Sequence, residues 1–337
     1  MLTPADLGRL AGALRAAFCI DGDVEFSVEI DPSDMDEARL DAMAGIGVTR
    51  ASLGVQDFDP KVQKAINREQ GYDLTSGVVT GLRQRGIAAV NLDLVYGLPH
   101  QTVDGVAETV KKCLSMRPDR IALFGYAHVP WFKKHQTMID EAALPGAEER
   151  LAQAARAAEL IRAAGYEAIG IDHFALPGDA LARAARNGEL RRNFQGYTDD
   201  ACETLIGLGP SSVSRYPEGY AQNAPAMGVY ARAVGAGSLP VARGIALSAE
   251  DRARGWVIER LMCDFAFSVD ELMALGAEIG PAVVRQAEAI AASQPGRLVR
   301  AGDRFVIPPA ARARARSVAA GFDAYFGKGT ARHSAAV

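Results

Sequence analysis

The chain has 337 residues, of which 49% are hydrophobic and 23% are charged, a composition typical of folded globular proteins. Its formal net charge is −4, so it lacks the basic balance that general nucleic-acid binding requires. The sequence contains no apolar run of about 18 residues, so we predict no membrane-spanning helix. Its beginning, MLTPADLGRL, has no basic region before an apolar stretch, so we predict no signal peptide and a cytoplasmic location.

The first half of the chain alternates helical and strand patterns. Apolar residues at helical spacing predict helices over residues 4–18, 33–45, 59–69, 73–85 and 102–116. Short apolar runs predict strands over residues 24–31, 50–56, 87–95 and 120–126. This alternation is typical of an α/β fold in which helices cover a parallel sheet.

Polar side chains lie at or just after the carboxyl ends of the four predicted strands. They are Glu29 and Asp31, Gln56 and Asp57, Asp93, and Tyr126 and His128. Any one of them could simply mark the end of a strand. Because the carboxyl ends of parallel strands meet at one edge of a sheet, the recurrence at four strands predicts a binding site there.

The second half of the chain has a different pattern. Helices are predicted over 147–164 and 178–188, with a short strand and turn over 166–174 between them. A polar and aromatic segment, RRNFQGYT (191–198), and a glycine-rich loop, GLGPSSVS (207–214), follow. From about residue 244 the sequence predicts helices and then a hairpin over 297–307 with a Gly-Asp turn, the pattern of a winged-helix-like domain.

The four cysteines are Cys19, Cys113, Cys202 and Cys263. No two of them have the CxxC or CxxxC spacing that places metal or cluster ligands on one loop. In a chain without a signal peptide, we predict that they are free thiols and that the chain contains no metal site of its own.

Several longer segments resemble one family, the oxygen-independent coproporphyrinogen III oxidases. The segments are VEIDP (28–32), SLGVQDFDPKVQKAINREQ (52–70), NLDLVYGLPHQT (91–102), YAHVPWFKKHQ (126–136), DHFALP (172–177), RNFQGYT (192–198), AQNA (221–224), LPVARG (239–244) and LMCDF (261–265). The resemblance extends from about residue 3 to 326. DHFALP and RNFQGYT distinguish this family from related radical S-adenosylmethionine (SAM) proteins, including haem chaperones, that share the shorter motifs.

The resemblance implies a partial (β/α) radical-SAM barrel that lacks its first strands, followed by a smaller, mostly helical, winged-helix-like domain. We place the barrel and its extension at 1–240, the C-terminal helical domain at 241–326 and a disordered tail at 327–337.

The family resemblance also implies an activity and its cofactors. Members remove carbon dioxide from two propionates of coproporphyrinogen III, which leaves vinyl groups and gives protoporphyrinogen IX for haem biosynthesis. The implied cofactors are a [4Fe–4S] cluster and two SAM molecules, which carry the chemistry while the protein orients them. The implied partners are the porphyrinogen and a reducing electron donor, and we expect a monomer in the complete form.

Residues that match the motifs take their implied roles from the family. The residues implied to contact SAM are Glu29, Gln56, Arg68, Asp93, Ala127 and Val213. Among them, Arg68 has the forked geometry that suits a carboxylate. The candidate substrate residues are Arg191, Arg192 and Arg243 for the carboxylates, and Phe194 and Tyr197 for the ring. The alternative for the acidic residues is a capping or ion-pair role, and for the arginines it is a solvated surface charge.

The sequence departs from the family in two motifs. It contains neither a CxxxCxxC motif nor a GGGTPT segment, and no residue is assigned as catalytic. We therefore expect no oxidase activity from this chain alone, and an exposed apolar edge at strand 24–31 that favours self-association. We interpret the chain as an N-terminally truncated member of the family, whose complete form carries the activity. The alternatives are a cluster-free protein that binds haem precursors or SAM on the same scaffold, and an interaction module that reuses it.

Overall fold

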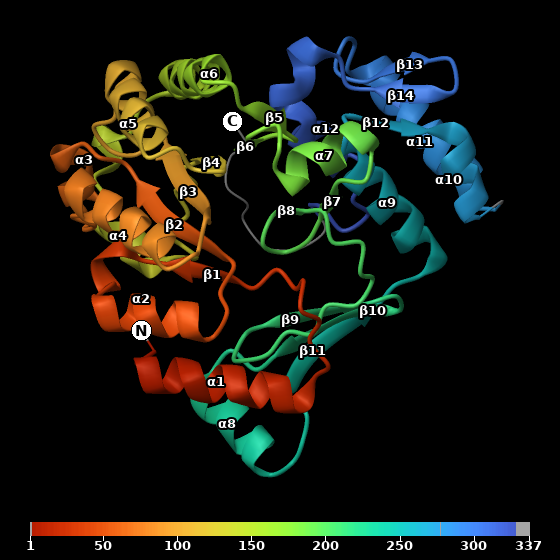
Figure 1. The fold of residues 1–337 in the computed structure, drawn as a ribbon. Coiled ribbons are helices and arrows are strands. Elements are labelled where there is room, and N and C mark those ends of the chain that lie inside the picture. Colours follow the sequence, from red (N-terminus) through yellow and green to blue (C-terminus); the bar gives the residue numbers. More distant parts are fainter. Residues whose placement is uncertain (1, 277, 328–337) are drawn as a thin grey trace. The chain divides into compact units, whose positions relative to one another are not determined.

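The computed structural model describes residues 2–276 and 278–327. The chain divides into two compact units that meet in sequence between Ala182 and Arg183 (Figure 1). The predicted domain boundary at 240/241 falls inside the second unit. Of the predicted tail at 327–337, only Gly327 belongs to the described residues.

The first unit is built on a six-stranded sheet with the order β1-β2-β3-β4-β6-β5. The strands are β1 (Ser27–Ile30), β2 (Arg50–Gln56), β3 (Ala89–Tyr96), β4 (Arg120–Gly125), β5 (Glu167–Ile169) and β6 (His173–Ala175). Strands β1 to β4 pair in parallel, which confirms the predicted parallel sheet. The single strand predicted over 166–174 is instead the antiparallel pair β5 and β6, because Gly170 takes a left-handed conformation (φ 55°) and turns the chain between them.

Helices cover one face of this sheet, and α2, α4 and α5 lie along β1 to β3 in Figure 1. The helices of the unit are α1 (Pro4–Ala17), α2 (Glu37–Gly45), α3 (Pro60–Ala65), α4 (Tyr72–Gln84), α5 (Val103–Ser115) and α6 (Ala147–Ala163), with 3-10 turns η1 (Pro32–Asp34), η2 (Lys134–Met138) and η3 (Glu141–Ala143). Side chains alternate along each strand, so Ala51, Leu53 and Val55 of β2 are buried in the core that these helices cover. The intervening residues of β2 form the other face of the sheet, which carries the candidate site.

Strand β1 is the outermost strand of this sheet among the described residues. Its edge position agrees with the prediction, but the predicted apolar character does not. Ser27 and Glu29 are exposed, whereas Val28 is half-buried and Ile30 is buried. Exposed polar side chains weaken an edge strand as a site of association. Self-association of the chain therefore stays a prediction.

Among the described residues, the second unit contains three small sheets and a helical layer. The elements are β7 (Arg191–Arg192), β8 (Tyr197–Thr198), β9 (Val213–Tyr216), β10 (Gly219–Asn223), α8 (Met227–Gly235), β11 (Val241–Ala246), α9 (Ala249–Cys263), β12 (Ala266–Ser268), α10 (Val269–Leu275), α11 (Gly280–Ser293), β13 (Val299–Ala301), β14 (Arg304–Val306), η4 (Pro309–Arg314) and α12 (Ala315–Ala320). Helix α7 (Ala180–Asn187) crosses the boundary between the units. Strands β7 and β8 form a two-stranded sheet, β9 to β11 form an antiparallel sheet, and β12, β14 and β13 form another.

The elements from α9 to β14 follow the order helix, strand, helix, helix, strand, strand. This order is that of a winged helix and confirms the predicted winged-helix-like end of the chain. The predicted hairpin turn lies at Gly302, which has a φ of 62°. The Phe267 and Phe305 rings stack in its core with centroids 5.2 Å apart. Within the described part of the chain, no helix is both long enough and apolar enough to cross a membrane.

Candidate functional site

The candidate site lies on the face of the parallel sheet opposite its core. The strand register places Glu29, Ser52, Asn91 and Arg120 in one row across β1 to β4. The next row toward the carboxyl ends contains Gly54, Asp93, Ala122 and His173. These rows bring polar groups from separate segments of the sequence together on one face of the unit.

Asp93 is the centre of this polar face. Its carboxylate accepts hydrogen bonds from the Ser52 hydroxyl at 3.0 Å and from the Asn91 amide at 2.7 Å. The Asn91 amide also donates to the Ser52 hydroxyl at 2.8 Å, so the three side chains hold one another. Burial raises the pKa of Asp93 despite these hydrogen bonds and the nearby charges of Arg68 and His173. A partly desolvated carboxylate of this kind is suited to bind a ligand ammonium or hydroxyl group.

Arg68 reaches the same face from the segment that follows α3. One terminal nitrogen of its guanidinium donates to the carbonyl oxygen of Gly54 at 3.1 Å and pairs with the Asp31 carboxylate at 3.0 Å. The Gln70 amide also donates to Asp31 and fixes this carboxylate. The Nε atom of Arg68 is buried and has no hydrogen-bond partner among the described residues. Such an unpaired buried donor favours a ligand that accepts hydrogen bonds.

Gly54 leaves the space that Arg68 and Gln56 occupy. A Cβ atom at position 54 would lie 2.8 Å from the Gln56 amide nitrogen and 2.9 Å from an Arg68 terminal nitrogen. The pairing of β2 with β3 also shifts register between Gly54 and Gln56, and Gln56 has a φ of 63°. Bulges re-aim side chains at the ends of strands. The bulge therefore contributes to the placement of the Gln56 amide beside Arg68.

Asp57 was expected at the strand-end rim, but the structure places it in the helical layer. Its side chain is 1% exposed and accepts hydrogen bonds from the Thr109 hydroxyl at 3.0 Å and from the Gln101 amide. Burial raises the pKa of Asp57. The left-handed backbone of Gln56 turns the chain, so Asp57 anchors α5 and the turn after β3 instead of facing the site.

The remaining predicted contacts of the first unit lie at the carboxyl ends of β1 and β4. Glu29 and Ala127 are both exposed, and the carbonyl of Ala127 accepts a hydrogen bond from the Gln136 amide at 3.0 Å. Next to Ala127, the Tyr126 hydroxyl and the His128 ring are 3.1 Å apart. The first unit therefore contains five of the predicted SAM contacts: Glu29, Gln56, Arg68, Asp93 and Ala127. Two of them, Glu29 and Asp93, lie in the two register rows described above.

Three residues of this face were not among the predicted site residues: Ser52, Asn91 and His173. Ser52 and Asn91 lie within the quoted motifs and alternate in phase with Gly54 and Asp93, so strand periodicity could have found them. His173 follows in DHFALP, and its ring nitrogen lies 2.7 Å from the Asp172 carboxylate. Its place in the Asp93 row depends on the antiparallel pairing of β6 with β4, which the sequence does not specify.

The segment RRNFQGYT forms a hairpin that is anchored on α9 of the second unit. The Tyr197 side chain is buried, and its hydroxyl donates to the carbonyl oxygen of Met262 at 2.8 Å. The Arg192 guanidinium stacks over the Tyr197 ring at 4.8 Å, and its backbone amide donates to Glu259 at 3.0 Å. Arg191 lies 3.8 Å from the same carboxylate. Of the five candidate substrate residues, Arg191, Arg192 and Tyr197 thus contact other residues of this hairpin or of α9.

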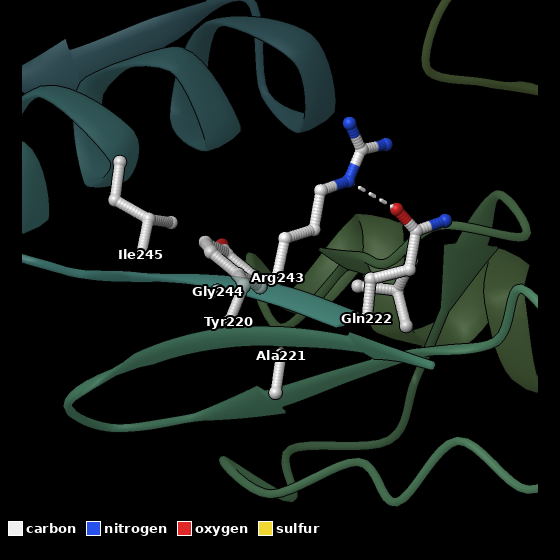
Figure 2. Close-up of a pocket in the computed structure, with 7 residues that line it drawn as sticks. Tyr220, Ala221, Gln222, Arg243, Gly244 and Ile245 are labelled. Carbon is white, nitrogen blue, oxygen red and sulfur yellow. Dashed lines mark hydrogen bonds between the residues drawn. The ribbon is translucent and has the colours of Figure 1, made fainter. Parts of the chain in front are cut away.

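Phe194, Arg243 and Val213 are more accessible parts of the same unit. Phe194 is 58% exposed at the tip of the hairpin, and its ring packs edge-to-face against Tyr220 with centroids 5.5 Å apart. Arg243 is exposed on β11, and Val213 begins β9. A pocket on the β9-β10-β11 sheet is lined by both residues (Figure 2).

The polar face of the first unit fits SAM by its donors and acceptors. It offers the unpaired Nε of Arg68, the buried Oδ1 of Asn91 without a partner among the described residues, and the space above Gly54. A methionine carboxylate suits Arg68, and an ammonium or ribose hydroxyl suits Asp93.

The cysteines do not fit a [4Fe–4S] cluster. Cys113 and Cys263 are buried in helices of different units, and Cys19 and Cys202 are exposed in different units. Among the described residues, no three His, Cys, Asp or Glu side chains are grouped as metal ligands. These four thiols cannot supply the three thiolates on one loop that the family motif provides.

Substitution of Gly54 by alanine is expected to weaken SAM binding about tenfold or more, because the new Cβ displaces the Arg68 and Gln56 side chains. Both displaced groups are ends of flexible side chains, so the melting temperature should change little. Isothermal titration with SAM and thermal unfolding measure the two effects. Gly77→Ala on α4 is the matched control, since its Cβ would meet no atom within 4 Å. Equal SAM affinity of Gly54→Ala and wild type would argue against this placement of SAM.

Comparisons with known proteins agree with the resemblance of the motifs. Residues 2–113 match the Radical SAM superfamily. The chain is 50% identical to the oxygen-independent coproporphyrinogen III oxidase of Paracoccus denitrificans, over 100% of this chain and 74% of that protein. It is 45% identical to the protein of the same name from Bradyrhizobium diazoefficiens, over 100% of this chain and 75% of that protein.

A solved structure gives the same result for the fold. The coproporphyrinogen III oxidase from Escherichia coli, described as a radical SAM enzyme, is 34% identical in sequence to this chain. The two structures match over 96% of this chain and 75% of the Escherichia coli chain. The TM-score of the two structures is 0.92, which confirms the predicted radical-SAM α/β fold. Membership of the superfamily implies SAM and a [4Fe–4S] cluster as cofactors of the family. The chain belongs to the oxygen-independent coproporphyrinogen III oxidases, a family of radical SAM oxidoreductases.

Proposed function

We propose that this chain provides the SAM-binding and substrate-binding residues for the oxygen-independent conversion of coproporphyrinogen III to protoporphyrinogen IX. In this reaction each of two propionate side chains loses a hydrogen atom, carbon dioxide and an electron and becomes a vinyl group, a step of haem biosynthesis. The observation that carries the proposal is the polar face around Asp93, in a chain that is 50% identical to an oxidase of this name.

The proposed roles follow from the contacts of each residue. Arg68, held by Asp31 and the Gly54 carbonyl, binds the methionine carboxylate through its remaining donors. Asp93, fixed by Ser52 and Asn91, accepts hydrogen bonds from the ammonium or a ribose hydroxyl. Glu29 and Gln56 contact the remaining polar groups, and Ala127 contributes backbone and apolar contact to the adenosine. SAM, when bound, is the family's source of the radical that removes hydrogen from the propionate.

A second SAM molecule is part of the proposal. Val213 lies in the second unit, whereas the other predicted contacts lie in the first. This division supports two SAM molecules that contact different sets of residues. For the substrate, we propose Arg191 and Arg243 as carboxylate contacts and Phe194 as the ring contact. Arg192 and Tyr197 shape the hairpin that carries Arg191 and Phe194.

The positions of the cysteines favour a second candidate function. A protein that binds SAM or haem precursors without turnover needs the polar face and the arginines but no cluster thiolates. The two candidates share their binding residues and differ only in conversion of the substrate. A reducing electron donor, a monomeric state and a cytoplasmic location stay predictions for the oxidase.

A SAM titration of the purified chain, followed by an anaerobic assay with coproporphyrinogen III and a reductant, tests both functions. We expect SAM binding that weakens about tenfold or more in Arg68→Met, because the charged hydrogen bonds to the carboxylate are lost. Arg9→Met on α1 is the matched control, since the Arg9 side chain is 84% exposed.

The outcomes separate the two candidates. Formation of protoporphyrinogen IX by the purified chain supports an active oxidase. Binding of SAM and substrate without conversion, which we expect for this chain alone, supports a role in binding only. A chain that binds no SAM, or binds it with the same affinity in Arg68→Met, contradicts the proposed site.

A further inference from the structure

One face of the β9-β10-β11 sheet forms a shallow pocket of about 230 Å³. The strand register places Gln222 opposite Arg243 on one side and Val213 on the other, and places Tyr220 opposite Ile245. Side chains alternate along a strand, so these five residues share one face, and Ala221 points to the other (Figure 2). All five line the pocket.

Gln222 fixes the orientation of Arg243 within this pocket. Its amide nitrogen donates to the carbonyl oxygen of Ser211 at 2.9 Å, so its amide oxygen must face the other way. That oxygen accepts a hydrogen bond from the Nε atom of Arg243 at 2.7 Å. Gln222 thus acts as a positioning residue for the guanidinium and leaves the two terminal nitrogens of Arg243 available to a ligand.

The loop that holds Gln222 is itself anchored. The Asn223 amide donates to the carbonyl oxygens of Gly207 and Gly209, both at 3.0 Å. The Ser212 hydroxyl closes the same loop on the Leu208 carbonyl at 2.7 Å. These bonds hold the glycine-rich segment 207–212 against β10. The Ser211 carbonyl that orients Gln222 therefore belongs to an ordered support.

Arg243 is a cation without an anionic partner in the described part of the chain. Among the described residues, its side chain forms a hydrogen bond only with the neutral Gln222 amide. The surroundings are otherwise apolar, because the Tyr220 ring, Ile245 and Val213 line the pocket beside Arg243. A Cβ atom at position 244 would lie 2.8 Å from the Tyr220 carbonyl oxygen, so the close approach of β11 to β10 requires glycine here.

We infer that Gln222 and Arg243 form a fork for a carboxylate carried on a large apolar body, and that this carboxylate is a propionate of the porphyrinogen. The inference rests on the proposed function for the identity of the ligand. A guanidinium whose Nε is already bound presents its two terminal nitrogens in the plane that matches the two oxygens of a carboxylate. The apolar side chains of Tyr220, Ile245 and Val213 beside it suit the edge of a tetrapyrrole. The methionine carboxylate of SAM has the same chemistry and is the competing source.

Binding of coproporphyrin III, the stable oxidised form of the substrate, tests the inference by fluorescence titration of the purified chain. Its tetramethyl ester keeps the macrocycle but has no carboxylates. We expect the wild type to prefer the acid over the ester. Arg243→Met should weaken binding of the acid about tenfold or more and leave binding of the ester unchanged. Arg243→Lys should restore binding only in part, because an ammonium cannot make the paired hydrogen bonds.

Gln222→Leu tests the positioning role, because it keeps the charge of Arg243 but removes the acceptor that orients it. We expect this variant to lose about threefold to tenfold in affinity for the acid. Arg232→Met on α8 is the matched control, since Arg232 is also exposed in the same unit but does not line the pocket. Circular dichroism of each variant verifies that the unit is folded.

Three results would overturn the inference. They are equal binding of acid and ester by the wild type, unchanged binding of the acid in Arg243→Met, and loss of SAM affinity in Arg243→Met with binding of the acid retained. The third result would assign the fork to the methionine carboxylate. Failure of the proposed SAM site is distinguished from these results, because it is measured by SAM binding through Arg68 in the other unit. The assignment of Arg243 as a substrate contact fails together with this inference.

Discussion

Reconstitution of the purified chain with iron and sulfide is expected to leave no stable four-iron cluster. Cluster ligands must be thiolates that converge on one site. Burial raises the pKa of the Cys113 thiol, and it raises the pKa of Cys263 to about 12. At neutral pH both thiols are therefore protonated within the core. Only Cys19 and Cys202 are exposed, and they belong to different units.

Iron counting and electronic absorption after desalting measure this prediction. A double variant, Cys19→Ser with Cys202→Ser, is the control, since it removes the exposed thiols that could hold adventitious iron. Iron that falls to background in the double variant would confirm that the wild type bound it only at the surface. A stoichiometric four-iron cluster in the wild type would contradict the prediction and would require thiolates that converge from distant parts of the chain.

The parallel sheet could be predicted from the sequence because its strands are buried on the core face and end in polar residues. Residues of β2 show why this worked, since Ala51, Leu53 and Val55 alternate with Ser52, Gly54 and Gln56. The hairpin of β5 and β6 could not be predicted from the same pattern. Its turn depends on the backbone conformation of Gly170, which apolar periodicity does not report.

The candidate site shows the same limit at single residues. Asp57 comes directly after a predicted strand and Asp93 lies near the carboxyl end of another, yet only Asp93 faces the site. The bulge after Gly54 and the left-handed backbone of Gln56 reverse the direction of Asp57, and a two-residue period cannot indicate that change. Tyr197 gives a second case, because its hydroxyl binds a carbonyl that lies 65 positions away in the sequence. Long-range partners of this kind appear only in the folded chain.

Asp93→Asn is expected to weaken SAM binding by about 10-fold to 100-fold, the effect of losing a charged hydrogen bond in a partly buried site. The same change should stabilise the folded chain at neutral pH. Burial raises the pKa of Asp93, so the folded protein holds a proton more tightly there than the unfolded chain does. The free energy of unfolding therefore falls as the pH rises from 3.8, the ordinary pKa of aspartate, through the higher pKa of Asp93 in the folded chain. The asparagine variant avoids this loss.

Thermal unfolding at pH 4 and pH 8, together with SAM titration, measures both effects. The melting temperature of Asp93→Asn relative to wild type should be higher at pH 8 than at pH 4, while SAM affinity is reduced. Asp21→Asn, in the loop after α1, is the matched control, since this carboxylate is exposed outside any helix and should change neither quantity. An asparagine variant that is less stable at both pH values would mean that the ionised carboxylate stabilises the fold. The ionised Asp93 would then stabilise the fold through its hydrogen bonds with Ser52 and Asn91, whether or not SAM is bound.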